Sequence, residues 1–330
     1  YMERGLKKRW MGVLFAVLIT VTFGLAFNSV QSNTMSAALQ SAFSVEPLNS
    51  GIVISVLTLV IIFGGVHRIA AISSVIVPVM AVGYIALALF VVLANIDLIP
   101  VVVEQIVGNA FGWHQAVGGG IGTALMQGIK RGLFSNEAGM GSAPNAAATA
   151  HVTHPAKQGF IQALGVFTDT LLICSCTAFI ILFGEDYIGS GLDGIQLTQA
   201  ALTSEVGNIG GIYVAIATLF FAYSSILGNY YYGEANIRFF TSRQWPVVLY
   251  RMLVGGMVLF GSLASLNLVW NLADVTMALM SICNLIAIFL LGKYAFRLLD
   301  DYLAQKRKGI KSPVFHKEQM KDIEQDLECW

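Results

Sequence analysis

The sequence predicts an all-α integral membrane protein, and three features of the chain support this class. First, 56% of its 330 residues are hydrophobic and only 12% are charged, whereas a soluble domain carries roughly 25% charged residues. Second, the apolar residues gather in runs that can cross a bilayer at about 1.5 Å per residue. Third, one polar, glycine-rich stretch at 128–151 lies between such runs.

Eight membrane spans account for the apolar runs. They are predicted at 10–27, 51–66, 72–94, 116–150, 160–183, 209–229, 247–263 and 266–291. A polar stretch at 28–44 follows the first span, and an amphipathic segment at 96–114 is expected to lie on the membrane surface. The last two spans are joined so closely that we expect a hairpin. The spans form a predicted transmembrane domain over 1–297, and a charged cytoplasmic tail is predicted over 298–330.

The basic residues orient these spans. Of the 19 Lys and Arg residues, 17 lie before the first span, after the second and fourth spans, between the sixth span and the mouth of the seventh, and after the last span. The connections between these positions carry none. Because cytoplasmic connections are enriched in Lys and Arg, we expect both ends of the chain to be cytoplasmic. The two exceptions, Lys130 and Arg131, lie inside the fourth span.

Composition and motifs argue against several other functions. The net charge of zero argues against a nucleic-acid partner. Three of the four cysteines lie in apolar runs and are expected to be core residues, not disulfide or zinc ligands. No catalytic triad, metal-ligand spacing, signal peptide, channel filter or sensing domain is recognisable. Glu137 and Asp169 are the only candidate carboxylate pair for an intramembrane enzyme, and they lack a motif, so no enzymatic activity is expected.

The fourth span is predicted to be a discontinuous helix. Four residues that strain a continuous helix crowd it: Gly132, Gly139, Gly141 and Pro144. We expect the helix to end near Arg131, to be unwound over 134–137, and to restart near Ala143. Unwound backbone at membrane depth survives only where it is buried in protein or lines a wet cavity, and in transporters such breaks bind substrates and ions. A loop outside the membrane is the alternative.

The amino-acid sequence of this stretch resembles a known family motif. RGLFSNEAGMGSAP at 131–144 resembles the signature of the alanine or glycine:cation symporter family, also called the sodium:alanine symporter family. The resemblance implies a LeuT-type inverted-repeat fold, in which the eight spans correspond to core helices three to ten. The residues YMERGL at 1–6 resemble the sequence that follows the first helices in members of this family. The resemblance therefore implies that upstream helices complete the site, and that the 330 residues alone would not transport.

The break supplies the predicted substrate-binding residues, which are Phe134, Ser135, Asn136, Glu137 and Gly139. Glu137 could receive a substrate ammonium group or accept hydrogen bonds from the freed backbone N–H groups, and the structural role is favoured. Arg131 is expected to cap the first half-helix or to pair with Glu137.

A second informative stretch, 220–234, carries adjacent hydroxyls at Ser224 and Ser225 among aromatic residues. Sodium is a hard cation that prefers oxygen ligands. The family resemblance implies that these hydroxyls form a sodium site with the missing first helix, with the Phe221 carbonyl as a third ligand. Alternatively, both serines simply donate to carbonyls of their own helix.

Other polar residues at membrane depth have open roles. Asn28, Gln31 and Asn33 could contact substrate or bind neighbouring helices, and Gln31 is included in the predicted substrate site. Trp270 is included too, as a lid over the pocket, although it could be an interfacial residue. Two buried charges remain to be placed: Asp169 is expected to pair with a cation across the bundle, and the role of Asp274 is open. Glu234 is expected to be an inner-gate or an interfacial residue.

These observations predict a secondary active transporter in a bacterial plasma (inner) membrane. Its function would be sodium-coupled symport of alanine, glycine or a similar small neutral amino acid by alternating access, with sodium as the coupling ion. The alternative is a proton-coupled symporter, or one for another small solute, on the same fold. We expect a monomer in the lipid bilayer, with no nucleic-acid partner.

Overall fold

The computed structural model describes residues 1–64, 66–111, 119–184, 190–320 and 327, and these residues form helices and no strands. Seven helical segments in this part of the chain are long and apolar enough to cross a membrane. They are Arg9–Phe43, Pro47–Gly64, Val77–Ala94, Pro155–Phe183, Asn208–Phe240, Trp245–Leu263 and Leu266–Arg307. They match seven of the eight predicted spans, so the all-helical membrane class is confirmed, while the span count and the LeuT-type fold stay predictions.

The first span is longer than predicted. It runs without interruption as α2 (Arg9–Val21), the π-helix η1 (Thr22–Phe27) and α3 (Asn28–Phe43). The polar stretch at 28–44 was therefore wrongly separated from it. The polar side chains of α3 stay inside the bundle because they find partners there: Ser32 donates to the Val258 carbonyl, and Asn33 donates to the carbonyls of Gly261 and Ala264. Buried polar groups with such partners do not force a helix to leave the membrane.

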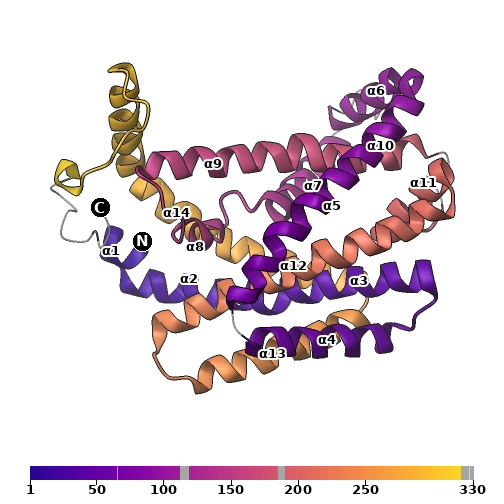
Figure 1. Cartoon of the computed structure of the whole chain (residues 1–330), viewed down its shortest axis with the longest axis horizontal. Helices are drawn as coiled ribbons and strands as arrows, with labels where there is room; N and C mark the ends of the chain where they lie inside the picture. Colours follow the sequence, from indigo (N-terminus) through magenta and orange to yellow (C-terminus); the bar gives the residue numbers. More distant parts are fainter. Residues whose placement is uncertain (65, 112–118, 185–189, 321–326, 328–330) are drawn as a thin grey trace.

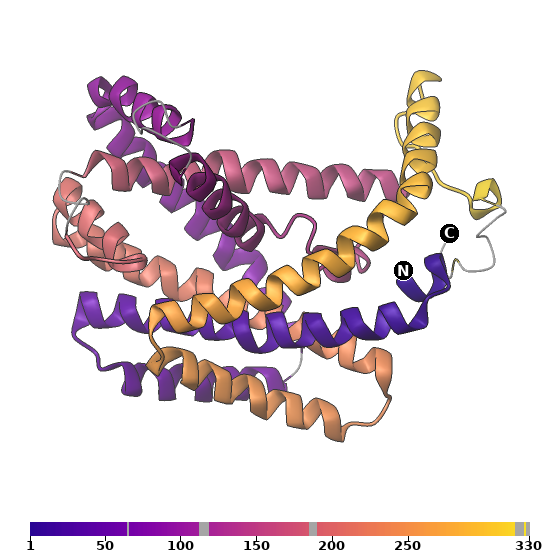
Figure 2. The same cartoon turned by 180° about the vertical axis from the view of Figure 1, so that it is seen from behind.

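The long first helix is the centre of one layer. It packs against α12 (Asn208–Phe240) and α13 (Trp245–Leu263), and α13 also packs against α4 (Pro47–Gly64) (Figures 1 and 2). Tyr250 of α13 fills the space beside Gly24 and Gly233, where an added Cβ would lie 2.3 Å and 1.9 Å from its hydroxyl oxygen. Small residues allow helices to approach closely where no water drives their association.

A second group of helices packs on the other side of α12. It contains α5 (Val66–Ala94), α10 (Ser175–Phe183) and α11 (Ile195–Val206), whose buried side chains share one apolar cluster. The short helix η2 (Ile96–Leu98) and α6 (Ile99–Ala110) follow α5. The predicted surface position of this segment stays a prediction, and residues 112–118 lie outside the described part.

The predicted break is present, but it lies further along the chain than expected. Helix α7 (Gly119–Asn136) continues through Phe134, Ser135 and Asn136, so these three residues are helical and the prediction of an unwound 134–137 segment was wrong for them. The non-helical segment covers 137–142, and the chain restarts as α8 (Ala143–Ala147), as predicted. The start predicted at residue 116 lies outside the described residues.

Helix α7 ends at Asn136 because the backbone conformation changes at the next residue. Glu137, Gly139 and Gly141 all have positive φ, at 57°, 84° and 86°. Gly132, by contrast, is accommodated within the helix, because a single glycine costs a helix only about 1 kcal/mol. After α8, the chain forms α9 (Pro155–Phe167), the π-helix η3 (Thr168–Cys174) and α10.

The last helix, α14 (Leu266–Arg307), is continuous across the predicted domain boundary at 297. Its middle contacts α1 (Met2–Leu6), where Gly5 lies next to Leu291, and its far end lies on the same side of the bundle as α1 (Figure 1). The following segment folds back: Phe315 is buried, and its N–H donates to the Thr153 carbonyl at 3.0 Å. The short helix η4 (Lys317–Met320) ends this described stretch, and the domain boundary stays a prediction.

Candidate functional site

One cavity of about 400 Å³ lies where the first helix, the end of α7 and the middle of α12 meet. It is lined by Phe27, Gln31, Phe134, Ser135, Glu137, Ser224, Ser225, Gly228, Asn229 and Tyr232. Six of these were predicted as site residues from the sequence. The lining combines aromatic faces, neutral hydrogen-bonding groups and one carboxylate, which suits a small polar molecule with an ammonium group or a monovalent cation.

Aromatic rings form one wall of this cavity. The Phe134 ring lies between Phe27 and Trp270, and both centroid distances are 4.5 Å. Trp270 does not itself line the cavity; it supports Phe134 from α14. Three rings at these distances make a stiff apolar surface, so the size of the cavity depends on Phe134.

Arg131 continues this stack. Its guanidinium carbon lies 3.9 Å from the centroid of the Trp270 ring, and its Nη2 donates to Oδ1 of Asp274. Lys130 Nζ lies 3.2 Å from the other oxygen of the same carboxylate. The predicted pairing of Arg131 with Glu137 was therefore wrong, because a carboxylate on α14 is the partner. This arrangement gives Lys130, Arg131 and Asp274 a shared role in joining α7 to α14.

Glu137 begins the break and lines the cavity. The Ser142 hydroxyl donates to its Oε2 at 2.6 Å, which ties the two ends of the break together. The backbone N–H of Ala138 is satisfied by Oδ1 of Asn136 at 2.9 Å instead. The favoured structural role of Glu137 is consistent with the first contact, although its partner is a hydroxyl and not a backbone N–H group.

The two adjacent serines of α12 both line the cavity. Their hydroxyls donate to the Phe221 carbonyl, at 2.8 Å from Ser224 and 3.0 Å from Ser225. This is the local bonding that was the alternative to an ion site. It uses the single proton of each hydroxyl, so the oxygen lone pairs remain for a cation or a donor in the cavity. Phe221 itself is not part of the lining.

The three carboxamides of the first helix have separate roles. Asn28 is fully buried, donates to the Gly24 carbonyl and accepts from Asn229 at 3.1 Å. Asn33 binds two carbonyls of α13, as described above. Gln31 is the one that lines the cavity.

Several predicted residues lie beside the cavity and not in its wall. Asn136 donates to Thr170 of η3 at 3.1 Å, and the Gly139 carbonyl accepts from Asn284 of α14. Asp169 is only half-buried and accepts from Ser135 at 2.6 Å. The expectation that Asp169 is buried was wrong, and its Oδ2 is bound by the hydroxyl of a cavity residue. Its pairing with a cation stays a prediction.

Sequence reasoning missed part of the lining on α12. Gly228, Asn229 and Tyr232 follow Ser225 at spacings of three, four and seven residues, so they occupy the same helix face. This periodicity would have found them once Ser225 was placed at a site.

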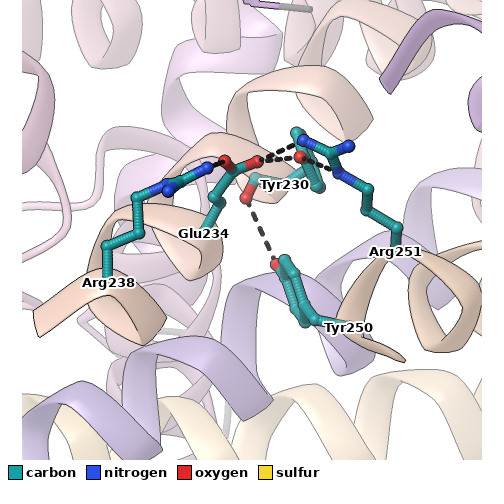
Figure 3. A network of polar contacts seen from close by, with 5 residues as sticks. All are labelled: Tyr230, Glu234, Arg238, Tyr250 and Arg251. Carbon is teal, nitrogen blue, oxygen red and sulfur yellow. Dashed lines mark hydrogen bonds and ion pairs between the residues drawn. The ribbon is translucent and has the colours of Figure 1, made fainter. Parts of the chain in front are cut away.

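Glu234, two residues after Tyr232 on α12, belongs to a buried polar network (Figure 3). Arg238 binds one of its oxygens, while Tyr230 and Arg251 donate to the other, with the Arg251 contact at 3.3 Å. Arg251 also donates to the Tyr230 hydroxyl at 2.8 Å. Glu234 is therefore a connection between α12 and α13 and not merely an interfacial residue.

Replacing Gly141 with alanine is expected to destabilise the break. The residue has φ of 86°, and an added Cβ would lie 2.7 Å from Asn284 and 2.8 Å from Phe15. Left-handed backbone at a non-glycine residue costs on the order of 1–3 kcal/mol before any clash. We expect the melting temperature of the detergent-purified protein to fall by several degrees. Gly128→Ala on α7, where an added Cβ meets nothing within 4 Å, is the control; an equal fall in both would contradict this view.

Comparison with known proteins identifies the family of the chain. The family model described as "Sodium:alanine symporter family" matches residues 1–317. The chain is 56% identical to the probable sodium/glutamine symporter GlnT of Bacillus subtilis over its whole length, which covers 69% of that relative. It is 52% identical to the amino-acid carrier protein AlsT of the same species, with 100% of this chain and 70% of AlsT covered. It is 38% identical to the sodium/alanine symporter AgcS of Methanococcus maripaludis, with 88% and 66% covered.

Proposed function

The chain belongs to the sodium:alanine symporter family, and we propose that it is a sodium-coupled symporter of alanine or glycine that works by alternating access. Its relatives are described as transporters, and it is a multi-pass membrane protein and not an enzyme. In its proposed setting, the protein lies in a bacterial plasma membrane as a monomer, with both ends of this chain in the cytoplasm.

The observation that carries the proposal is the convergence of the cavity lining. A zwitterionic amino acid needs groups for its ammonium and its carboxylate and a limited space for its side chain. In the proposed binding mode, the Glu137 carboxylate and Gln31 carboxamide contact these polar groups, while Phe134, supported by Trp270, limits the side chain. Ser135 contributes a hydroxyl at the end of α7, next to the break.

Ser224 and Ser225 are the proposed sodium ligands. Both hydroxyl protons are donated to the Phe221 carbonyl, so both oxygens can face a cation with their lone pairs. The Phe221 carbonyl already accepts from both hydroxyls and lies outside the cavity lining, so it orients the two proposed ligands and is not proposed as a third. Upstream helices of the kind implied by the family would complete the coordination. In this mechanism, sodium orders the site, so substrate affinity and sodium affinity rise together.

Glutamine is a second candidate substrate, because the 56% identical relative is described as a sodium/glutamine symporter. Proton coupling is a second candidate for the ion, because other relatives are described as sodium/proton-dependent alanine carriers.

Uptake in proteoliposomes tests the proposal. The full-length protein should accumulate labelled alanine or glycine with sodium outside, and much less with choline. Excess unlabelled glutamine should compete weakly. Equal uptake with choline outside would contradict sodium coupling. Uptake of glutamine but not of alanine or glycine would make glutamine the substrate.

The variant Ser225→Ala should raise the sodium concentration needed for half-maximal uptake by about tenfold, which corresponds to the loss of one cation ligand worth roughly 1.4 kcal/mol. Ser204→Ala is the matched control, because its hydroxyl also donates to a carbonyl of its own helix, that of Ala201 at 2.7 Å, and it is exposed on α11, away from the cavity. An unchanged sodium dependence in Ser225→Ala would contradict the ion site.

A further inference from the structure

A second cavity lies on the other side of the break. It has a volume of about 240 Å³, lies next to α1, and is lined in part by Phe15, Asn145, Ala235 and Asn236. The basic residues predict that this end of the bundle is cytoplasmic. The same helix α12 supplies Tyr232 to the first cavity and Asn236 to the second, four residues and about 6 Å apart. The two cavities are therefore separated by a thin barrier.

Apolar side chains form this barrier. Phe23 and Met140 are fully buried, Phe15 is 4% exposed, and all three belong to one cluster with Tyr232 packed against it. The rings of Phe23 and Tyr232 meet edge to face at 5.2 Å. Met140 is the member contributed by the break, so its place in the barrier depends on how the break is held.

Asn284 of α14 holds the break from the barrier side. It is 3% exposed, and its Nδ2 donates to the Gly139 carbonyl at 2.8 Å. Its Oδ1 accepts from the Tyr1 hydroxyl at 2.5 Å, and the Tyr1 ring packs against Phe15 at 6.0 Å. One amide group thus joins three elements: the break, α14 and the segment that leads into α2.

We propose that Asn284 is a positioning residue of the transport cycle, whose amide holds the break against α14 and keeps the barrier between the two cavities closed. The inference rests on the proposed transport function. Gly139 has a non-helical backbone, so its carbonyl is free of the helical ladder and available to a side chain. When the Asn284 contact opens, Met140 can leave the barrier and the first cavity connects to the second.

The barrier acts between two states, and the amide contact stabilises only the closed one. Its loss should therefore shift the population toward the open state by about tenfold, as expected for one buried hydrogen bond. The substrate site would be weakened only indirectly, because Asn284 does not line the first cavity.

Cysteine accessibility tests the inference without requiring transport. The probe is Gly228→Cys in the first cavity, where an added Cβ meets nothing within 4 Å. The natural cysteines are replaced by alanine, and a membrane-impermeant maleimide is applied from the cytoplasmic side of inside-out membrane vesicles, so the label must cross the barrier to react. Asn284→Leu should raise the labelling rate about tenfold, and Tyr1→Phe should raise it by a smaller factor, about twofold to threefold. Sodium should slow labelling in the parent more than in Asn284→Leu.

Two controls separate gating from loss of structure. Ser281→Ala is the matched variant, because Ser281 is buried on the same helix and its hydroxyl has no hydrogen-bond partner among the described residues; its labelling rate should equal the parent rate. A second probe, Ala222→Cys, reports general loosening. An unchanged rate in Asn284→Leu, or an equal rise at both probes, would overturn the inference. Absence of sodium-dependent uptake by the parent would remove the proposed function but leave the labelling result readable.

Discussion

Replacing Glu234 with glutamine is expected to destabilise the protein by about 3 kcal/mol, because it leaves the partly buried Arg251 guanidinium without its counter-charge. The Glu234 side chain is 8% exposed and that of Arg251 is 18% exposed, whereas Arg238, the other cation on this carboxylate, is 45% exposed. Glutamine has nearly the same shape and can still accept from Tyr230. The expected loss is therefore one of charge balance and not of packing.

Thermal unfolding in detergent, followed by the loss of monodisperse protein, measures this effect. Arg238→Ala is the control for an exposed ion pair and should cost less than about 1 kcal/mol. The double variant Glu234→Gln with Arg251→Leu should recover much of the lost stability, because it removes the uncompensated charge. Arg251→Leu alone completes the comparison. If the free energies of destabilisation of Glu234→Gln and Arg251→Leu simply add in the double variant, then Glu234 and Arg251 are not coupled as the structure indicates.

Replacing Phe134 with alanine is expected to lower kcat/KM for alanine uptake by about 100-fold or more. Removal of a well-packed phenylalanine costs roughly 3–5 kcal/mol in a protein interior, and Phe134 contacts rings on both sides. Without the Phe134 ring, Trp270 loses a packing partner, and Arg131, which stacks on Trp270, is held less firmly. The wall that limits the size of the substrate side chain would then lose its shape. Phe134→Leu keeps part of the volume and should lose less.

The same variant should change selectivity. With the Phe134 ring removed, glutamine should compete with labelled alanine more effectively than it does in the parent, because a pocket that is one ring larger no longer excludes the longer side chain. Phe167→Ala is the control: this residue is 63% exposed on α9 and is not among the cavity residues, and its uptake should be unchanged. A Phe134→Ala variant with normal uptake and normal selectivity would remove Phe134 from the substrate site.

The sequence by itself determined the class of the protein, the approximate extent of seven spans and the existence of the break. These follow from local properties: apolar runs need a bilayer, and clustered glycines with a proline interrupt a helix. It also indicated the family and six of the cavity residues, since Ser224 and Ser225 or Glu137 are unusual residues at membrane depth. Their functional roles stay predictions.

Only the tertiary structure decided which partners these residues meet. The Arg131 guanidinium had a carboxylate nearby in sequence, Glu137, yet it pairs with Asp274, which is 143 residues away. The polar face of α3 stays in the bundle because the carbonyls of Val258, Gly261 and Ala264 accept hydrogen bonds from Ser32 and Asn33. Similarly, Asn284 looks like any polar residue in the last span until the fold places it against Gly139. Helix periodicity and residue type act over a few residues, whereas these contacts depend on how distant helices are packed, and no local pattern in the chain encodes that arrangement.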